Sequence, residues 1–199
     1  MKVKIKKEGK VKEFKLISSW EEVTLAKWLQ LIDFETGTKT EEATETIAAL
    51  SDIPKKLVKE LALSDVANIM SKVAELQAKQ DTKLKRIIEI NGIEYGFHPD
   101  LDSISLGEYA DIEQFIKNGI DKNLPELMAV LYRPVKEKKN DIYIIDAYDG
   151  DIRLRTEEMK QMSAQQVQSA LVFFYTLGKA LSEILPLYLM EKLKETKTQ

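Results

Sequence analysis

The sequence contains no cysteine, one histidine and only 8 glycines among its 199 residues. Without cysteine the chain forms no disulfide, binds no metal through thiolates and has no cysteine nucleophile. A single histidine excludes zinc and iron sites built from several imidazoles, and none of the glycines falls in a phosphate-binding loop. We therefore predict no catalytic, cofactor-binding or metal-binding residues, and the lack of cysteine fits a reducing compartment.

Long apolar runs are also absent. The two longest, residues 170–177 and 184–190, are separated by Lys179 and Glu183. Neither approaches the roughly 20 residues that cross a bilayer as a helix. The basic first residues are followed by no apolar stretch of the kind found in signal peptides. We therefore expect a soluble protein with no membrane partner.

The charge balance is nearly even. Charged residues make up 32% of the chain with both signs interspersed, and the formal net charge is only -3. Such a chain has no overall attraction for nucleic acid or for anionic lipid. The hydrophobic content of 44% is enough for a sizeable core. The polar residues 79–83 predict a boundary between an N-terminal hairpin-plus-helical subdomain, 1–80, and a C-terminal hairpin-and-helix subdomain, 81–199.

Three pairs of short segments alternate apolar and polar residues, which predicts antiparallel β-hairpins. The clearest pair surrounds Asn91 and Gly92, because both residues accept the positive φ of a type I′ turn. Residues 136–141 are highly charged and are expected to form a solvated loop. The paired segments are residues 3–7 with 10–17, 84–90 with 93–97, and 142–147 with 152–155.

Most of the remaining chain shows helical periodicity. Thr40 is expected to cap one helix, and Ser105 with Glu108 and Ser163 with Gln166 match the capping-box pattern. Pro54 is expected to be the first residue of one short helix, and Ser64 to cap the helix that follows it. The predicted helical segments are residues 25–32, 43–50, 54–61, 65–76, 106–116, 126–132 and 163–193. In the segment that follows Ser105, the residues expected along one face are Leu106, Tyr109, Ile116 and one of Ile112 and Glu113. The fold class is thus α+β, mainly helical, with two or three short antiparallel hairpins and a long C-terminal helix.

The first predicted hairpin, together with Lys2 just before it, is unusually basic, with seven lysines and two glutamates between residues 2 and 15. Lysines neutralise phosphates, so this hairpin could bind nucleic acid. Lysines on the solvent face of a strand also prevent edge-to-edge aggregation, and we favour this second interpretation. The residues expected on the apolar face are Val3, Ile5, Val11 and one of Phe14 and Leu16.

His98 is the only imidazole that could take part in catalysis. Together with Asp100 and Asp102 it could form an acid–base pair or bind a hard metal ion. The alternative is that His98 is a loop residue after a hairpin, with Pro99 shaping the exit of the chain, and we favour this alternative.

Two other groups of polar residues have structural interpretations. Asp146, Asp149 and Asp151 surround Gly150, but their spacing does not match a calcium-binding EF-hand loop, so a turn is favoured. Arg133 lies at the end of a predicted helix, where its guanidinium can bind terminal carbonyls or a carboxylate. A structural role is favoured for Arg133 as well.

The C-terminal helical segment is apolar on nearly every side. One face can pack on the rest of the protein, and the surplus requires another partner. We therefore predict a protein-binding surface there. Its residues are Phe173, Tyr175, Leu185, Leu187, Tyr188 and Leu189.

Three motifs resemble a group of tailed-bacteriophage proteins. They are GEYADIE at residues 107–113, MAVLYRPV at 128–135 and LVFFYTLG at 171–178. Their order and rough spacing match that group between residues 84 and 190, and the first 80 residues resemble it more weakly. The motif positions that carry over, Tyr109, Asp111, Tyr132, Arg133 and Pro134, are expected to determine the fold.

This resemblance implies a phage assembly protein that is not an enzyme. It is most similar to tail-assembly chaperones and baseplate-hub assembly proteins, which shelter apolar parts of a tail component such as the tape-measure protein. The expected partners are other phage proteins, bound through an apolar groove, with the long C-terminal helix and the helices of the first 80 residues as the expected surfaces. Self-association is left open, and the expected location is the host cytoplasm or the virion. The alternatives are a minor structural component of the virion and a small nucleic-acid-binding regulatory protein.

Overall fold

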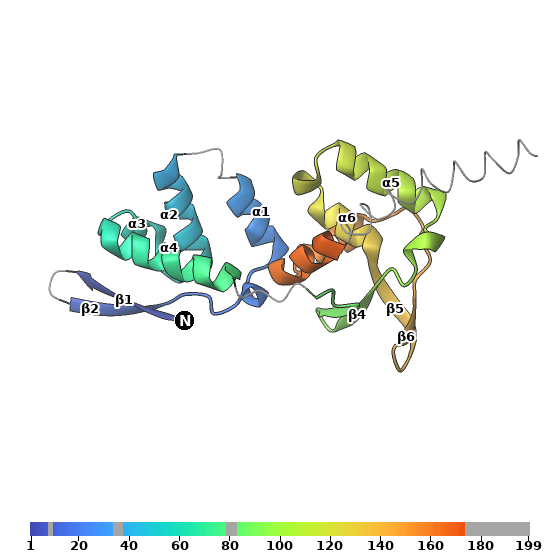
Figure 1. The fold of residues 1–199 in the computed structure, drawn as a ribbon, viewed down its shortest axis with the longest axis horizontal. Helices are drawn as coiled ribbons and strands as arrows, with labels where there is room; N and C mark the ends of the chain where they lie inside the picture. Colours follow the sequence, from blue (N-terminus) through green and yellow to red (C-terminus); the bar gives the residue numbers. More distant parts are fainter. Residues whose placement is uncertain (8–9, 34–37, 79–82, 174–199) are drawn as a thin grey trace, which may run out of the picture.

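The protein has two regions of packed secondary structure along one long axis (Figure 1). The computed structural model describes residues 1–7, 10–33, 38–78 and 83–173. In this part of the chain most elements are helices, and the strands form one two-stranded and one four-stranded antiparallel sheet. The predicted α+β class, mainly helical with short hairpins, is therefore confirmed.

The N-terminal region packs a β-hairpin against a group of helices. Val3 and Ile5 are each 3% exposed, as predicted for the apolar face of the hairpin. Val11 is 60% exposed and pairs with Lys6, so its predicted place on that face was wrong. A strand alternates its side chains, so Val11 cannot share a face with Phe14. The elements are β1 (Lys2–Lys7), β2 (Lys10–Lys15), α1 (Leu25–Asp33), α2 (Lys39–Leu50), α3 (Lys55–Val58) and α4 (Leu63–Ala78).

Backbone hydrogen bonds fix the hairpin to the end of α2. The Ile17 amide donates to the Leu50 carbonyl at 2.9 Å, and the Asp52 amide donates to the Lys15 carbonyl at 3.0 Å. The first core cluster forms where these elements meet. It includes Val3, Ile5, Leu16, Trp20, Ile47, Leu50, Val58, Ile69 and Val73.

The C-terminal region surrounds a four-stranded sheet with the strand order β3-β4-β5-β6. Its second core cluster includes Tyr95, Phe97, Leu127, Met128, Leu131, Tyr132 and Met159. The elements are β3 (Ile87–Ile90), β4 (Ile93–Phe97), α5 (Leu106–Lys117), α6 (Leu124–Leu131), β5 (Tyr132–Lys139), β6 (Ile142–Ile145) and α7 (Arg153–Met159). Asn91 and Gly92 join β3 to β4 with φ angles of 52° and 79°, which confirms the predicted turn.

The two regions are joined by backbone hydrogen bonds around the start of α1. The Leu25 amide donates to the Met162 carbonyl at 2.7 Å, and the Ala164 amide donates to the Val23 carbonyl at 2.7 Å. Leu25 packs in the second core cluster, whereas Ala164 packs in the first, and Trp28 contacts both clusters. The chain therefore crosses between the cores more than once, and a division into subdomains at residue 80 remains a prediction.

The segment after α6 differs from the prediction. The chain passes directly from α6 into β5 at Tyr132, so residues 136–141 lie mostly in a hairpin and the predicted solvated loop was wrong. The lysines and Glu137 of β5 are exposed, because this strand runs beyond the core, and its charge therefore resembled that of a loop. A bulge between Val135 and Glu137 turns the hairpin, so that Tyr143 packs over Gly96.

The predicted strand at residues 152–155 was also wrong, because Ile152 is the N-cap of α7 and residues 153–155 form its first turn. The segment from Arg153 consists mainly of good helix formers, and its buried residues, Thr156 and Met159, lie three apart. This spacing places both residues on one face of a helix, whereas in a strand they would point to opposite faces.

The buried face of α5 is rotated from the predicted one. Leu106 is 83% exposed and Tyr109 57% exposed, whereas Glu108 and Ile112 are buried. The predicted capping box between Ser105 and Glu108 is confirmed. Glu108 faces inward because it also pairs with a buried arginine, and this polar contact outweighs the apolar stripe in setting the orientation of α5.

The predicted helix starts have different outcomes. α4 begins at Leu63, so Ser64 lies inside this helix and the prediction that it caps α4 was wrong. Thr38, and not Thr40, caps α2, and it forms a capping box with Glu41. The predicted cap of Ser163 on the last helix is confirmed, with the Gln166 amide donating to the Ser163 hydroxyl at 3.2 Å. Residues 164–173 are helical, and the rest of the predicted C-terminal helix lies outside the described residues. Within the part that the structure describes, no helix is long and apolar enough to cross a membrane.

Gly96 provides a test of the packing between β4 and the β5–β6 hairpin. A Cβ atom at this position would lie 2.5 Å from the Tyr143 ring and 2.7 Å from an Ile145 methyl group. Gly96→Ala is therefore expected to lower the free energy of unfolding by about 1–3 kcal/mol, measured by urea denaturation. Gly107→Ala is the control: its Cβ would meet only Tyr148, at 3.7 Å, so equal or greater stability is expected. Equal effects of the two changes would contradict the packing described.

Candidate functional site

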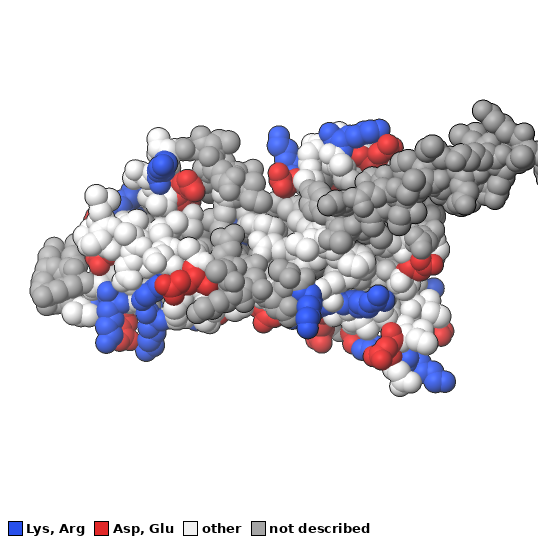
Figure 2. All heavy atoms as spheres, in the orientation of Figure 1, with Lys and Arg blue, Asp and Glu red and all other residues white. Residues whose placement is uncertain are grey.

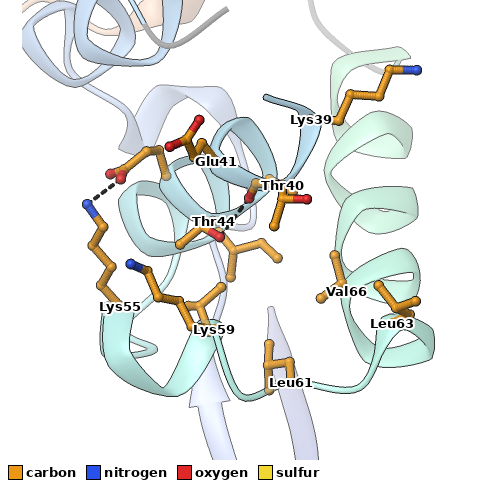
Figure 3. A pocket seen from close by; sticks show the side chains of 13 residues that line it. Lys39, Thr40, Glu41, Thr44, Lys55, Lys59, Leu61, Leu63 and Val66 are labelled. Atoms are coloured by element: carbon orange, nitrogen blue, oxygen red, sulfur yellow. Dashed lines mark hydrogen bonds and ion pairs between the residues drawn. The ribbon is translucent and has the colours of Figure 1, made fainter. Parts of the chain in front are cut away.

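An open apolar hollow of about 760 Å³ lies between α2, α3 and α4 (Figure 3). Ile47 and Val58 at its base are 0% and 4% exposed. Leu63, at the first turn of α4, is 86% exposed and stands at the rim. The other apolar side chains that line it are Ala43, Leu61 and Val66. The hollow is thus a non-polar surface that faces solvent on one side.

Local sequence signals position the walls of this hollow. The Thr38–Glu41 capping box fixes the start of α2, and Pro54 precedes the first residue of α3, where its fixed φ favours a helix. Ser51 ends α2, and its hydroxyl donates to the Ile47 carbonyl at 2.6 Å. The same hydroxyl accepts a hydrogen bond from the Ile53 amide at 3.2 Å, which fixes the short connection between α2 and α3.

The polar groups of the hollow are mostly at its edge. Thr44 is the buried exception, and its hydroxyl donates to the Thr40 carbonyl at 2.7 Å. The floor therefore has few polar groups to orient a small polar ligand, of the kind that usually determine specificity in small-molecule sites. The hollow is better suited to apolar side chains from a larger partner.

Charged residues surround the hollow, with Lys55 and Lys59 on one side and Lys39 on the other (Figure 3). Lys55 pairs with Glu45, and the Glu41 carboxylate accepts hydrogen bonds from Thr38. These hydrogen bonds, from the amide and then the hydroxyl of Thr38, lower the pKa of Glu41. Lys39 and Lys59 have no ion-pair partner within 4.0 Å in the described ranges of the chain. The charge of Lys59 also lowers the pKa of Glu41, which therefore stays ionised. With three lysines and two glutamates, the rim has one positive charge in excess.

A second polar group is buried in the C-terminal region. The Arg133 guanidinium lies 2.7 Å from the Glu108 carboxylate, and each side chain is 5% exposed. The His98 imidazole lies 3.4 Å from the same carboxylate. Burial would raise the pKa of Glu108, but hydrogen bonds from Ser105 and the charge of Arg133 outweigh it, so this pKa is lowered. Glu108 therefore connects the start of α5 with β4 and β5.

Tyr148 extends this group towards the surface. Its hydroxyl donates a short hydrogen bond to the Asp111 carboxylate, and the Arg133 guanidinium lies 5.8 Å from its ring centroid. Burial, and then the hydrogen bond to Asp111, raise the pKa of the tyrosine. Of the two structural roles predicted for Arg133, this geometry agrees with the bridge to a carboxylate. The residue directly follows Tyr132, the C-cap of α6, and is already part of β5.

The surroundings of His98 match neither predicted interpretation fully. The residue follows β4 as expected, but it is only 9% exposed, and its imidazole faces the Glu108 carboxylate. A hollow of about 150 Å³ lies beside it, lined in part by Asp100 and Phe173. In the described part of the chain, no three His, Asp or Glu side chains are placed to hold a metal ion.

The acidic residues around Gly150 form a turn. Gly150 has a φ of 78°, and the Asp149 carboxylate accepts a hydrogen bond from the Asp151 amide at 3.1 Å. Asp151 pairs with Arg153 through the Nε and a terminal nitrogen, at 3.0 and 2.9 Å. The hydrogen bonds from Arg153 lower the pKa of Asp151 to about 2. The favoured turn interpretation fits this arrangement.

Of the predicted partner-binding residues, only Phe173 lies in the described part of the chain. It is half-buried, and its ring lies 5.5 Å from that of Phe97, edge to face. Part of its surface is therefore used within the protein. The other five, Tyr175, Leu185, Leu187, Tyr188 and Leu189, lie outside the described residues.

The lysines of the β1–β2 hairpin are partly matched by acidic side chains (Figure 2). Glu13 lies 3.0 Å from Lys2 and 3.4 Å from Lys4, and Glu22 lies 3.7 Å from Lys15. The hydrogen bond from Lys2 is the largest cause that lowers the pKa of Glu13. These pairs reduce the positive charge that would be offered to phosphates.

The sequence places the helices of the first 80 residues among the expected partner-binding surfaces, but it identifies none of the residues of the hollow. The apolar stripes of α2 and α4 are predicted to be core, which is correct for Ile47 and Ile69. One sequence feature could have indicated the hollow. Leu63 is a large apolar residue that precedes the apolar stripe of α4 and is not buried in the core.

Comparison with protein-family models, with curated proteins and with solved structures finds no match.

His98 is the only histidine of the chain, which allows its titration to be tested. Burial lowers its pKa below the usual 6.5, so the unfolded chain takes up the proton first as the pH falls. The free energy of unfolding is therefore expected to fall as the pH drops below 6.5, until the lowered pKa is passed. The free energy of unfolding is expected to fall again below pH 4.5, because the pKa of Glu108 is lower in the folded protein than in the unfolded chain.

Urea titrations at a series of pH values would measure this dependence, with His98→Gln as the comparison. The variant is expected to lack the decrease in stability that begins below pH 6.5 and to retain the decrease below pH 4.5. A wild-type stability that stays constant from neutral pH to below 6.5 would contradict the burial of a neutral imidazole.

The Glu108–Arg133 pair can be tested by a double-mutant cycle. Arg133→Met leaves a buried carboxylate without its main partner, so a loss of about 3–5 kcal/mol in the free energy of unfolding is expected. Glu108→Gln can keep the capping box while it removes the charge. The double variant is expected to lose less than the sum of the single losses. Arg153→Met, at an exposed ion pair, is the control and is expected to unfold like the wild type.

Proposed function

We propose that this chain is a phage assembly protein that binds other phage proteins, as a tail-assembly chaperone does. The observation that carries the proposal is the open apolar hollow between α2, α3 and α4. A soluble protein rarely leaves a concave apolar surface open without a partner. The resemblance of the motifs at residues 107–113, 128–135 and 171–178 to tailed-phage proteins supports the same class of function.

A chaperone role requires a surface that accepts apolar segments and then releases them. Leu63 at the rim, with Leu61 and Val66 beside it, supplies such a surface without a closed cavity. The predicted C-terminal surface, which includes Phe173, would add to it. Under this proposal the protein acts in the host cytoplasm, and its partner is a tail component such as the tape-measure protein.

A role as a minor structural component of the virion is the alternative, and the same hollow would then be a permanent interface. A nucleic-acid-binding role finds less support, because Glu13 and Glu22 lie beside three of the hairpin lysines.

Capture of the tagged protein from phage-infected cells, with mass spectrometry of the bound proteins and of purified virions, tests the proposal. A tail protein recovered from the lysate, with this chain absent from virions, is the result expected of a chaperone. Stoichiometric presence in virions would support the structural role instead. Recovery of no phage protein, together with absence from virions, would overturn both.

The hollow is tested in the same experiment with Leu63→Glu. A carboxylate at the rim is expected to reduce recovery of the tail protein about ten-fold or more, because it would have to be buried in the contact. Leu106→Glu is the matched control, since Leu106 is 83% exposed on α5, in the other region of the protein. Equal recovery with both variants would exclude the hollow as the binding surface.

A further inference from the structure

We infer that the α2–α4 hollow binds a single amphipathic helix whose apolar stripe is bordered by acidic residues. This inference rests on the proposed function, since it names the kind of segment that the proposed partner presents. The observations that carry it are the openness and apolar lining of the hollow and the charges at its rim.

The lining favours a helix over a small molecule. Small-molecule sites enclose most of their ligand and orient it with a few polar groups. Here Leu63 at the rim is 86% exposed, and the Thr44 hydroxyl donates to the Thr40 carbonyl within α2. The remaining floor, with Ile47 and Val58, offers only apolar contact. A hollow of this kind is filled by the apolar side chains that a helix presents at positions i, i+3, i+4 and i+7.

The rim selects the charge of that helix. Three lysines and two glutamates line the hollow, so its rim has one positive charge in excess. Glu45 pairs with Lys55, whereas Glu41 keeps its charge, accepts hydrogen bonds from Thr38 and is also stabilised by the charge of Lys59. Lys39 and Lys59 are exposed, stand on different sides of the hollow and have no ion-pair partner within 4.0 Å in the described ranges (Figure 3). A helix seated in the hollow would thus pass between two ammonium groups. Acidic residues on both sides of its apolar stripe would face them, whereas lysines would be repelled.

Two designed peptides of roughly 15 residues, long enough to form a helix on binding, test this inference. They share one leucine stripe, which is bordered by glutamates in the first peptide and by lysines in the second. Fluorescence anisotropy of the labelled peptides with the full-length protein at low salt gives the two dissociation constants. The glutamate peptide is expected to bind about ten-fold more tightly, the size expected from two exposed charge pairs.

Charge reversal at the rim provides the decisive comparison. The double variant Lys39→Glu with Lys59→Glu is expected to reverse the preference, so that the lysine peptide binds more tightly. The control is Lys12→Glu with Lys122→Glu, which changes the net charge equally at exposed sites outside the hollow and should keep the wild-type preference. Leu63→Glu is expected to weaken the binding of both peptides, whereas Leu106→Glu is expected to leave the binding of both unchanged.

Each outcome supports or overturns the inference. Equal binding of the two peptides, or a preference that the rim variant does not change, would overturn the selection of acidic residues. Binding of neither peptide, or binding that Leu63→Glu leaves intact, would overturn the helix site. In those cases capture of a tail protein from infected cells would still support the proposed function through another surface. If the peptides bind but no phage protein is recovered from infected cells, the helix-binding site is supported and the proposed function is rejected.

Discussion

The crossing of the chain between its two cores is the constraint on which the rest of the fold depends. Backbone amides and carbonyls that leave water must find partners, and around α1 these partners come from the far end of the described chain. The Leu25 amide binds the Met162 carbonyl, the Ala26 amide binds the Lys160 carbonyl, and the Ala164 amide binds the Val23 carbonyl. Neither core can therefore be completed by a contiguous half of the sequence.

Glu108 imposes a similar constraint within the C-terminal region. One carboxylate oxygen closes the capping box of α5, and the other faces Arg133 and His98. A buried ion pair adds little net stability, because desolvation offsets the attraction of the charges. It does fix how α5 is rotated on the sheet, since any other rotation would leave a buried charge unmatched. The exposed positions of Leu106 and Tyr109 follow from that choice.

The features that the sequence predicted correctly are those decided by neighbouring residues. The turn at Asn91 and Gly92 requires only that both residues accept positive φ, and the capping boxes at Ser105 and Ser163 need a partner three residues away. The errors occur where distant contacts decide. β5 is charged like a loop but pairs with β4 and β6, and the face of α5 is set by Arg133 in another element. The hollow needs three helices at once, so no single periodicity reveals it.

The two kinds of aromatic chromophore are distributed unequally along the chain, and Trp28 lies between the two cores. Both tryptophans, Trp20 and Trp28, lie in or beside the N-terminal core, and all seven tyrosines follow from Tyr95 onward. Indole emission therefore reports on the first core and on the junction, whereas phenol absorbance reports on the C-terminal half of the sequence. The order in which the two parts of this molecule unfold can be followed optically, without attaching any label.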